Sequence, residues 1–418
     1  MYGFNETFMQ LLILLAVSLF VIAIAKKVRQ PYSIALVIVG LLLGISRIPF
    51  LEEAETFITQ SNVFQAIVIS LFLPILLGDA TLKLPFSSLM EQKKPVLALA
   101  FGGTLLSFVI IALAGYYLMG LPLIVAFTFA ALMSATDPIS VISIFKSLGV
   151  PKSIVTIIEG ESLFNDGIAV VLFQISSVYL LSYLEMGWMG LGSGALLFLK
   201  FSLGGIALGG LMGYLFSQAI RLYDDYPLEI GFSMLLFFGS YFIAEHFDVS
   251  GVIAVVVGGL VFGSYGSRIG MSEMTKMNIN SFWEVIALIA NSLIFLMIGL
   301  EIKYIDFSDK WPLIGAAVVI VLLGRTVALY ASVAFIRHFP GSWKMILNWG
   351  GLKGSLSIAL ALSLPPSFEG RADVLVLTFS VVVFSLLVQG LSMKPLVLKL
   401  GLSGEKAKRT HDERAPLR

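Results

Sequence analysis

The 418-residue sequence contains no cysteine and only three histidines. The absence of cysteine excludes disulfide bonds, thiolate metal sites and cysteine nucleophiles. His246, His338 and His411 lie near the ends of apolar segments or in the polar C-terminal stretch, so we expect no structural metal site. The sequence also has no basic block interleaved with aromatic residues, and we therefore expect no nucleic-acid partner.

Charged residues are scarce, at 13% of the chain, whereas hydrophobic residues make up 58%. With a mean hydropathy of +0.96, this composition is typical of a polytopic membrane protein that contacts the lipid bilayer. Breaks at charge clusters, proline and glycine predict an all-α protein with about thirteen transmembrane helices. The expected spans are residues 7–25, 31–46, 62–81, 95–118, 122–146, 153–184, 192–220, 227–245, 250–266, 278–300, 311–337, 343–365 and 373–398.

Lysine and arginine are distributed unevenly among the connections between these spans. If the N-terminus lies outside, 20 of the 27 basic residues are cytoplasmic, four are external and three fall within spans. Cytoplasmic loops carry an excess of basic residues, so this distribution predicts an external N-terminus and a cytoplasmic C-terminus in the cell (inner) membrane. We expect a transmembrane domain over residues 1–400 and a short cytoplasmic tail over 401–418.

The sixth expected span contains a polar stretch, which is unusual in a helix that crosses a membrane. Residues 159–166 (EGESLFND) place three carboxylates inside the otherwise apolar run 153–184. An ionised side chain inside a bilayer costs at least ~2.5 to 3.5 kcal/mol, so such groups usually have a function.

Helical spacing sorts these polar residues into two neighbouring stripes. Glu159, Ser162 and Asp166 share one face, and Glu161 with Asn165 forms an adjoining stripe. One helix therefore presents a polar edge to something other than lipid.

Two expected spans are interrupted near mid-membrane. Pro138 cannot donate a hydrogen bond to the Ser134 carbonyl, and it disfavours helical geometry at Asp137. Three glycines and Lys353 interrupt the twelfth span at residues 348–355. Paired breaks in corresponding parts of two halves indicate inverted repeats with a binding site near the membrane midplane.

Charge balance assigns the first partners of the buried groups. Glu161 needs a cation, and the permanently charged fork of Arg325 is expected to pair with it in an architectural role. Lys353 either neutralises the C-terminal dipole of a half-helix or helps to hold Asp137, and we favour the dipole role. Glu159 either lines an entry funnel or is simply solvated at the end of its span.

Asp166 is left without an obvious permanent partner. It is flanked by Asn165, Ser162 and the loosened backbone at Thr136 and Asp137. Oxygen ligands of this kind suit a hard monovalent cation, and removal from water also favours the protonated form of a carboxyl group. The same oxygen cannot hold both ions, so competition between them, combined with alternating exposure to the two sides, is sufficient to make an exchanger.

Two polar residues in the span 278–300 receive weaker interpretations. Glu284, near the start of the span, is expected to snorkel to the membrane surface. Asn291, two turns further along the same face, is expected to form a hydrogen bond between helices.

Six motifs distributed over residues 7–398 carry a family resemblance. They are LPILLGDA (73–80), ATDP (135–138), EGESLFND (159–166), FWE (282–284) with Asn291, GR (324–325) and GGLKG (350–354). Together they resemble the monovalent cation/proton antiporters of the cation:proton antiporter-1 type, the family of the bacterial NhaP antiporters and the animal sodium/proton exchangers. The resemblance implies thirteen helices, two crossed unwound helices, a homodimer and elevator-like alternating access. It also implies a core at about 95–184 and 311–398 and a dimerisation or scaffold domain at about 7–81 and 192–300.

The resemblance also implies roles for individual residues. Asp166 is similar to the ion-binding carboxylate of the Asn-Asp pair of the family, which it forms here with Asn165. Asp137, the Thr136 carbonyl and Ser162 are implied as further ligands, so a Na⁺ site is expected at Asp166, Asp137, Thr136 and Ser162. The amide of Asn165, where electrogenic relatives have a second aspartate, implies electroneutral one-for-one exchange.

Three further positions complete the implied site. Glu161 and Arg325 match the stabilising ion pair of the family, in agreement with charge balance. Asp79 matches an acidic position near the ion, where many members have the longer glutamate, so its contact with the ion is expected through water if at all. Lys353 stands where many members have arginine.

We therefore expect a secondary transporter that exchanges Na⁺ or Li⁺ for H⁺ and serves pH homeostasis, not an enzyme, with no cofactor beyond the transported ions. The alternative within transport is an antiporter for K⁺ or mixed monovalent cations that uses the same residues. An intramembrane aspartyl protease requires a Gly-x-Gly-Asp pattern, whereas Asp79 follows Leu76-Leu77-Gly78. A receptor derived from an antiporter would keep the fold and lose the site, which the intact Asn165-Asp166 pair argues against.

Overall fold

The computed structural model describes residues 2–28, 30–46, 68–223, 225–301, 307–336 and 339–404. The first part of the third expected span, residues 62–67, and the expected tail beyond residue 404, with its basic residues, lie outside the described residues. Four further basic residues used for orientation also lie outside them: Arg29, Arg47, Lys303 and Arg337.

Within these ranges all regular structure is helical. The α-helices are α1 (Tyr2–Val28), α2 (Tyr32–Ser46), α5 (Leu73–Lys83), α6 (Phe86–Glu91), α7 (Lys93–Leu97), α8 (Thr104–Met119), α9 (Leu123–Leu132), α10 (Ile139–Leu148), α11 (Lys152–Gln174), α12 (Leu180–Glu185), α13 (Trp188–Ile220), α14 (Tyr226–His246), α15 (Gly251–Val261), α16 (Ser267–Ile269), α17 (Glu273–Glu301), α18 (Trp311–Ser332), α19 (Gly341–Trp349), α20 (Ser355–Leu362), α21 (Arg371–Phe384) and α22 (Leu391–Lys399). Five π-helical segments join some of them: η2 (Val68–Phe72), η3 (Ala98–Gly103), η4 (Ile175–Tyr179), η5 (Phe262–Gly266) and η7 (Ser385–Gly390).

By length and composition, nine helical segments in the described part of the chain are able to cross a membrane, and α2, α9 and α10 are shorter apolar helices. When helices that continue through a π segment are joined, the two interrupted helices α9–α10 and α19–α20 are each counted once and the short α6 is set aside, the described residues form thirteen segments in the order of the thirteen expected spans. The prediction of an all-α polytopic membrane protein is therefore confirmed.

Local signals at the helix ends explain several of the boundaries. The Asp225 carboxylate accepts a hydrogen bond from the Leu228 backbone at the start of α14, and the Ser250 hydroxyl accepts one from the Ile253 backbone at the start of α15. Gly120 ends the helix α8 with a left-handed backbone, at φ +66°.

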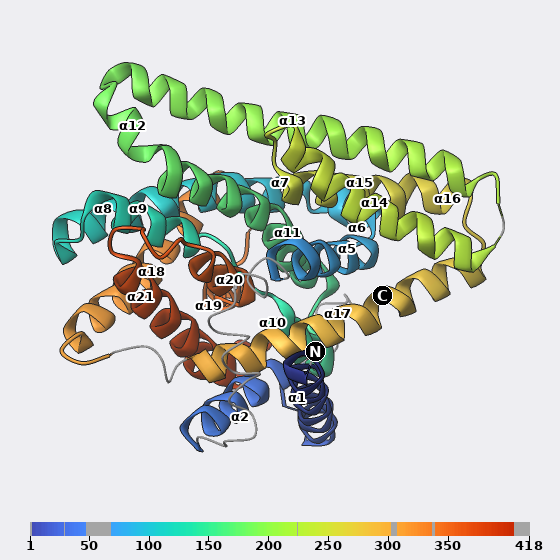
Figure 1. The fold of residues 1–418 in the computed structure, drawn as a ribbon, viewed down its shortest axis with the longest axis horizontal. Coiled ribbons are helices and arrows are strands. Elements are labelled where there is room, and N and C mark those ends of the chain that lie inside the picture. The colour runs from blue at the N-terminus through green and yellow to red at the C-terminus, as the bar shows by residue number, and fades with distance from the viewer. Residues whose placement is uncertain are drawn as a thin grey trace, which may run out of the picture.

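Contacts between the helices fall into two groups, and Figure 1 shows α13, α14 and α15 together along one edge and α18 and α21 together at another. In one group α2 packs on α17, and α15 packs on α5, α13 and α14. In the other group α8, α9, α18, α20 and α21 surround a separate apolar cluster that includes Val125, Phe129, Val321 and Leu377. The long helix α11 contacts both groups, through α9 on one side and α15 on the other.

Both predicted helix interruptions are present. The chain is unwound between α9 and α10 at residues 133–138, and between α19 and α20 at residues 350–354. The Asp137 backbone N–H donates to the Leu352 carbonyl over 2.8 Å, so the two unwound segments contact each other. Each broken helix is also followed by a long helix with an internal π segment, α11–η4 or α21–η7, which fits the expected repeat.

Close packing of α13 on α15 depends on glycine at particular positions. A Cβ atom at Gly209 would overlap the carbonyl oxygen of Ala254, whereas a Cβ at the next residue, Gly210, would meet nothing within 4 Å. We therefore expect Gly209→Ala to lower the free energy of unfolding by about 1 to 3 kcal/mol, the usual effect of overpacking. Thermal unfolding in detergent measures this, and Gly210→Ala is the matched control. Equal melting temperatures for the two variants would contradict the packing account.

Candidate functional site

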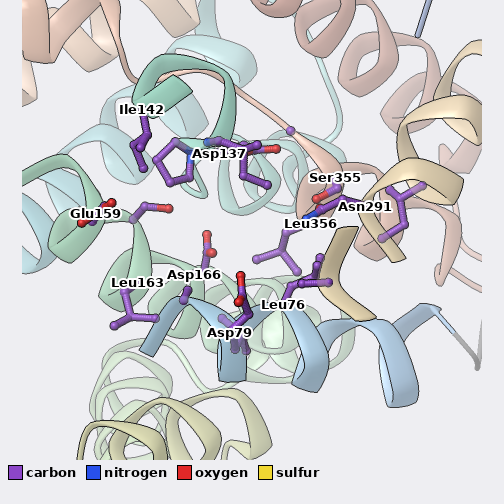
Figure 2. Close-up of a pocket in the computed structure, with 18 of the residues that line it drawn as sticks. Leu76, Asp79, Asp137, Ile142, Glu159, Leu163, Asp166, Asn291, Ser355 and Leu356 are labelled. Atoms are coloured by element: carbon purple, nitrogen blue, oxygen red, sulfur yellow. Dashed lines mark hydrogen bonds between the residues drawn. The ribbon is translucent and has the colours of Figure 1, made fainter. Parts of the chain in front are cut away.

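A cavity of about 400 Å³ lies where α5, α10, α11 and α17 meet the two unwound segments. Figure 2 shows Asp79 and Asp166 pointing toward Asp137 across this cavity. Three exposed lysines, one near the end of each of α1, α5 and α10, lie at its rim. The polar residues that line it are Lys26, Tyr32, Asp79, Lys83, Thr136, Asp137, Ser143, Lys146, Glu159, Ser162, Asp166, Glu284, Asn291, Ser355 and Ser357.

Helix α11 presents to the cavity the face that helical spacing predicts. Glu159, Ser162, Leu163 and Asp166 all line the cavity. Glu161, from the adjoining stripe, is buried elsewhere and is 2% exposed.

The unwound segment before α10 is held against α11 by two hydrogen bonds. The Ser162 hydroxyl donates to the Thr136 carbonyl over 2.5 Å, and the Asn165 amide donates to the Thr136 hydroxyl over 2.8 Å. The Asn165 Oδ1 and Asp166 Oδ1 atoms are buried and have no hydrogen-bond partner among the described residues. Buried polar atoms without a partner are costly and mark a place where a ligand, ion or water is expected.

Asp137 lies at the N-terminal ends of two half-helices. Its Oδ1 accepts a hydrogen bond of 2.9 Å from the Ile139 backbone at the start of α10, and its carboxylate also faces the Ser355 backbone at the start of α20. The partial positive charge at these helix ends favours a carboxylate there. Its second oxygen, Oδ2, is buried without a hydrogen-bond partner in the described part of the chain, which leaves it free to bind a cation.

Lys353 lies at the C-terminal end of the half-helix α9, on the other side of the break from the start of α10. Its ammonium group donates to the carbonyl oxygens of Met133 and, over 3.1 Å, of Ala135, directly after the end of α9. The Ser357 hydroxyl donates to the Leu132 carbonyl over 2.7 Å in the same place. Of the two roles considered for Lys353, this geometry matches compensation of the half-helix C-terminus.

Glu161 and Arg325 form a buried ion pair next to the unwound segment 350–354. The Arg325 Nη1 donates to Glu161 Oε1, and Nη2 donates to the Leu347 carbonyl in α19 over 3.3 Å. A Cβ atom at Gly351 would lie 2.8 Å from the Arg325 Nε, so this glycine leaves room for the guanidinium. The ion pair thus ties together α11, α18 and α19.

Two further acidic residues of the cavity lining, Asp79 and Glu159, each have a lysine partner near the rim. Both oxygens of the Asp79 carboxylate lie close to Lys83 Nζ, at 2.9 and 3.0 Å. Glu159 Oε1 lies 4.0 Å from Lys146 Nζ and lines the cavity, where an entry funnel would place it.

Sequence reasoning missed several groups that shape the site. Ser385 accepts a hydrogen bond of 2.9 Å from the Lys353 backbone, and Tyr32 lines the cavity. No sequence signal identifies these residues or Ser357, because each acts through a contact between distant parts of the chain. The Asp79–Lys83 pair did have a signal, since the two residues are four apart on one helix.

Comparison with known proteins places the chain in a family. Residues 14–399 match the family described as sodium/hydrogen exchanger, transmembrane. The chain is 65% identical over 403 residues to the Na⁺/H⁺ antiporter NhaH of Halobacillus aidingensis, covering 96% of this chain and 100% of that protein. It is 60% identical to the Na⁺/H⁺ antiporter NhaG of Bacillus atrophaeus, covering 91% of this chain and 72% of that protein.

A solved structure shares the fold. The sodium proton antiporter MjNhaP1 from Methanocaldococcus jannaschii superposes with a TM-score of 0.78 at 21% sequence identity, covering 95% of this chain and 99% of that one. These matches cover nearly the whole chain, and the broken helices and buried carboxylates are consistent with them. The chain therefore belongs to the family of transmembrane sodium/hydrogen exchangers.

Proposed function

We propose that this protein exchanges Na⁺ or Li⁺ for H⁺ across the cell membrane, with Asp166 binding the two ions in turn. One observation carries the proposal: an Asp166 oxygen is buried without a hydrogen-bond partner among the described residues, and Asp166 lines a cavity together with Asp137, Thr136 and Ser162. The names of the similar proteins, which are Na⁺/H⁺ antiporters, support sodium over the potassium alternative.

The proposed chemistry is competition at one carboxylate. A buried carboxyl group is stable when it is protonated or when it holds a cation, and one oxygen cannot do both at once. Sodium entering from the cavity displaces the proton, and a proton arriving at high concentration displaces sodium. Each ion that leaves is replaced by one of equal charge, and the neutral Asn165 adds no second titratable group, so the exchange is electroneutral and one-for-one.

The fixed charges around the site support this stoichiometry. Asp137 faces two helix N-termini, and Lys353 faces the carbonyl groups at a helix C-terminus. Each charge is therefore compensated by the protein itself. Asp166 is the carboxylate that remains for the transported ions.

Alternating access requires one part of the protein to move against another. We propose the two packed groups of helices as these parts, with the core at about 95–184 and 311–398 and the scaffold at about 7–81 and 192–300. The core carries Asp137, Asp166 and both broken helices, whereas α5 and α17 of the scaffold form the facing wall. A homodimer formed through the scaffold is also proposed, and size-exclusion chromatography with light scattering tests it.

Lys26, Lys83 and Lys146 at the rim suggest which side the cavity faces. Cytoplasmic segments are enriched in basic residues, so we propose that the cavity opens to the cytoplasm, with the N-terminus outside and the C-terminus inside. The proposed mechanism moves ions without converting a substrate and uses no cofactor, as expected of a transporter.

Exchange in proteoliposomes tests the proposed function. An imposed pH gradient, a pH-sensitive dye and the addition of Na⁺, Li⁺ or K⁺ report cation-driven proton movement. We expect a response to Na⁺ and Li⁺ but not to K⁺, unchanged when the voltage is clamped. A response to K⁺ would establish the alternative antiporter, and no response to any cation from about pH 5 to pH 9 would refute the proposal.

Gly354 is predicted to be required for exchange, because a Cβ atom there would overlap the Asp137 side chain. In Gly354→Ala, Asp137 must move away from the ion, and misplacing a reacting group by about 1 Å costs up to about a hundredfold in rate. We expect at least about a tenfold lower maximal rate of exchange in the same liposome assay. Gly315→Ala on α18, where a Cβ would meet nothing within 4 Å, is the control. Equal rates for the two variants would show that Asp137 need not stay in place.

A further inference from the structure

The scaffold wall of the cavity is formed largely by one face of α17. Glu284, Ala287, Leu288, Asn291 and Ile294 of this helix line the cavity, at the spacing of a single helical stripe. Glu284 is exposed, whereas Asn291 is buried, and the other residues of this stripe, Ala287, Leu288 and Ile294, are apolar. Asn291 is therefore the buried polar group that α17 contributes to the cavity.

The Asn291 amide oxygen forms no hydrogen bond within the described part of the chain. Asn291 is 6% exposed, and its Oδ1 has no hydrogen-bond partner among the described residues. The hydrogen bond between helices that the sequence suggests is therefore not made by this oxygen. The neighbouring Ser292 hydroxyl, by contrast, is satisfied within the helix, since it donates to the Ile289 carbonyl over 2.8 Å. A buried amide oxygen without a hydrogen bond destabilises the folded protein unless a ligand in the cavity contacts it.

The position of Asn291 points to the kind of ligand. It lines the cavity together with Ser355 and Leu356 at the start of α20, which α17 contacts and whose backbone faces Asp137, and Figure 2 labels all three residues at the same side of the cavity. The Asp137 Oδ2 and Asp166 Oδ1 atoms are likewise buried without hydrogen-bond partners in the described chain, and both residues line the same cavity. Unused oxygens thus come from both walls, and oxygen atoms are the ligands that a hard cation prefers.

We propose that Asn291 Oδ1 is a scaffold-side ligand for the partly hydrated monovalent cation that Asp166 and Asp137 bind from the core. This inference rests on the proposed exchange function and adds a residue from the facing helix to its site. Because the core moves relative to the scaffold, the core carries its own ligands to the other side of the membrane and leaves Asn291 behind. The contact with Asn291 therefore exists only while the cavity is open as it is in this structure.

This geometry predicts an effect confined to one side of the membrane. Leucine resembles asparagine in shape but has no oxygen, so Asn291→Leu removes the ligand and largely preserves the packing. We expect the KM for Na⁺ to rise about tenfold on the cavity side, the effect of losing one good polar contact. On the opposite side we expect the KM to stay within about twofold of wild type, together with the maximal rate.

Inside-out and right-side-out membrane vesicles expose the two sides separately, and Na⁺-driven proton movement gives the KM and the maximal rate in each. Asn291→Asp keeps an acceptor oxygen at the same position, so its KM should stay at or below the wild-type value. Ser292→Ala, one residue along the helix, is the matched control and should behave as wild type.

Three results would overturn the inference. They are an unchanged KM in Asn291→Leu, an equal rise on both sides, and a loss of maximal rate and thermal stability without a change in KM, which is the signature of a purely structural residue. Measuring the wild-type protein in the same vesicles distinguishes failure of this inference from failure of the proposed function on which it rests. Absence of exchange in wild type would refute the proposed function, whereas normal exchange in both wild type and Asn291→Leu would refute only the role of Asn291.

Discussion

Replacing Asp166 with asparagine should reduce Na⁺-driven proton exchange to the level of protein-free liposomes. The amide has nearly the same size as the carboxyl group, so the packing around α11 is preserved. It carries no negative charge for Na⁺ and does not titrate, so both halves of the exchange are lost together. Exchange in proteoliposomes measures the loss, and thermal unfolding in detergent checks that the variant is folded.

Asp373→Asn is the matched control for this change. The Asp373 carboxylate is partly exposed and pairs with Lys310 Nζ at 2.7 Å, and Asp373 is not part of the cavity lining. Exposed pairs contribute little, so this variant should exchange at the wild-type rate. If Asp166→Asn retained exchange, the ions would have to bind elsewhere and the proposed site would be wrong.

Replacing Arg325 with alanine should strongly destabilise the protein. The Glu161 carboxylate would remain buried, at 2% exposure, without the guanidinium that donates to it. Removing one partner of a buried ion pair typically costs about 3 to 5 kcal/mol, because the other charge is left uncompensated. We expect a lower yield of folded protein and a clear drop in the melting temperature in detergent.

A double variant separates the cost of the unpaired charge from the loss of packing. Glu161→Ala combined with Arg325→Ala leaves no buried charge at this position, so it should be more stable than Arg325→Ala alone. Lys310→Ala, which breaks the partly exposed pair with Asp373, should change stability by less than about 1 kcal/mol. A double variant no more stable than the Arg325→Ala variant would indicate that the guanidinium acts through its bond to Leu347 or through packing.

Much of the fold was accessible from the sequence because the membrane simplifies the problem. A segment that crosses a bilayer must be apolar, long and helical, so hydropathy alone predicts the order of the helices. The interruptions were also accessible, since Pro138 removes a backbone donor and three glycines surround Lys353. These local rules predicted the breaks at residues 133–138 and 350–354.

The candidate site was accessible only in part. The spacing of Glu159, Ser162 and Asp166 predicted their common face, and the excess of buried acidic charge predicted the partner of Glu161. Contacts between distant segments, such as the hydrogen bond of Ser357 to the Leu132 carbonyl, could not be predicted from the sequence. A serine in an apolar helix usually bonds to its own backbone, and only the crossing of the two broken helices gives this hydroxyl another partner.

The measurement that tests the central claim most directly is proton release on sodium binding. Purified wild-type protein and Asp166→Asn are titrated with Na⁺ in weakly buffered detergent solution, while a pH indicator counts the protons and calorimetry gives the Kd at several pH values. If one carboxylate binds either ion, wild type releases protons when Na⁺ binds, and its apparent Kd for Na⁺ rises about tenfold for each unit of pH below the point where the site is half protonated. Asp166→Asn should release none. Sodium binding with a Kd independent of pH and without proton release would contradict competition at Asp166.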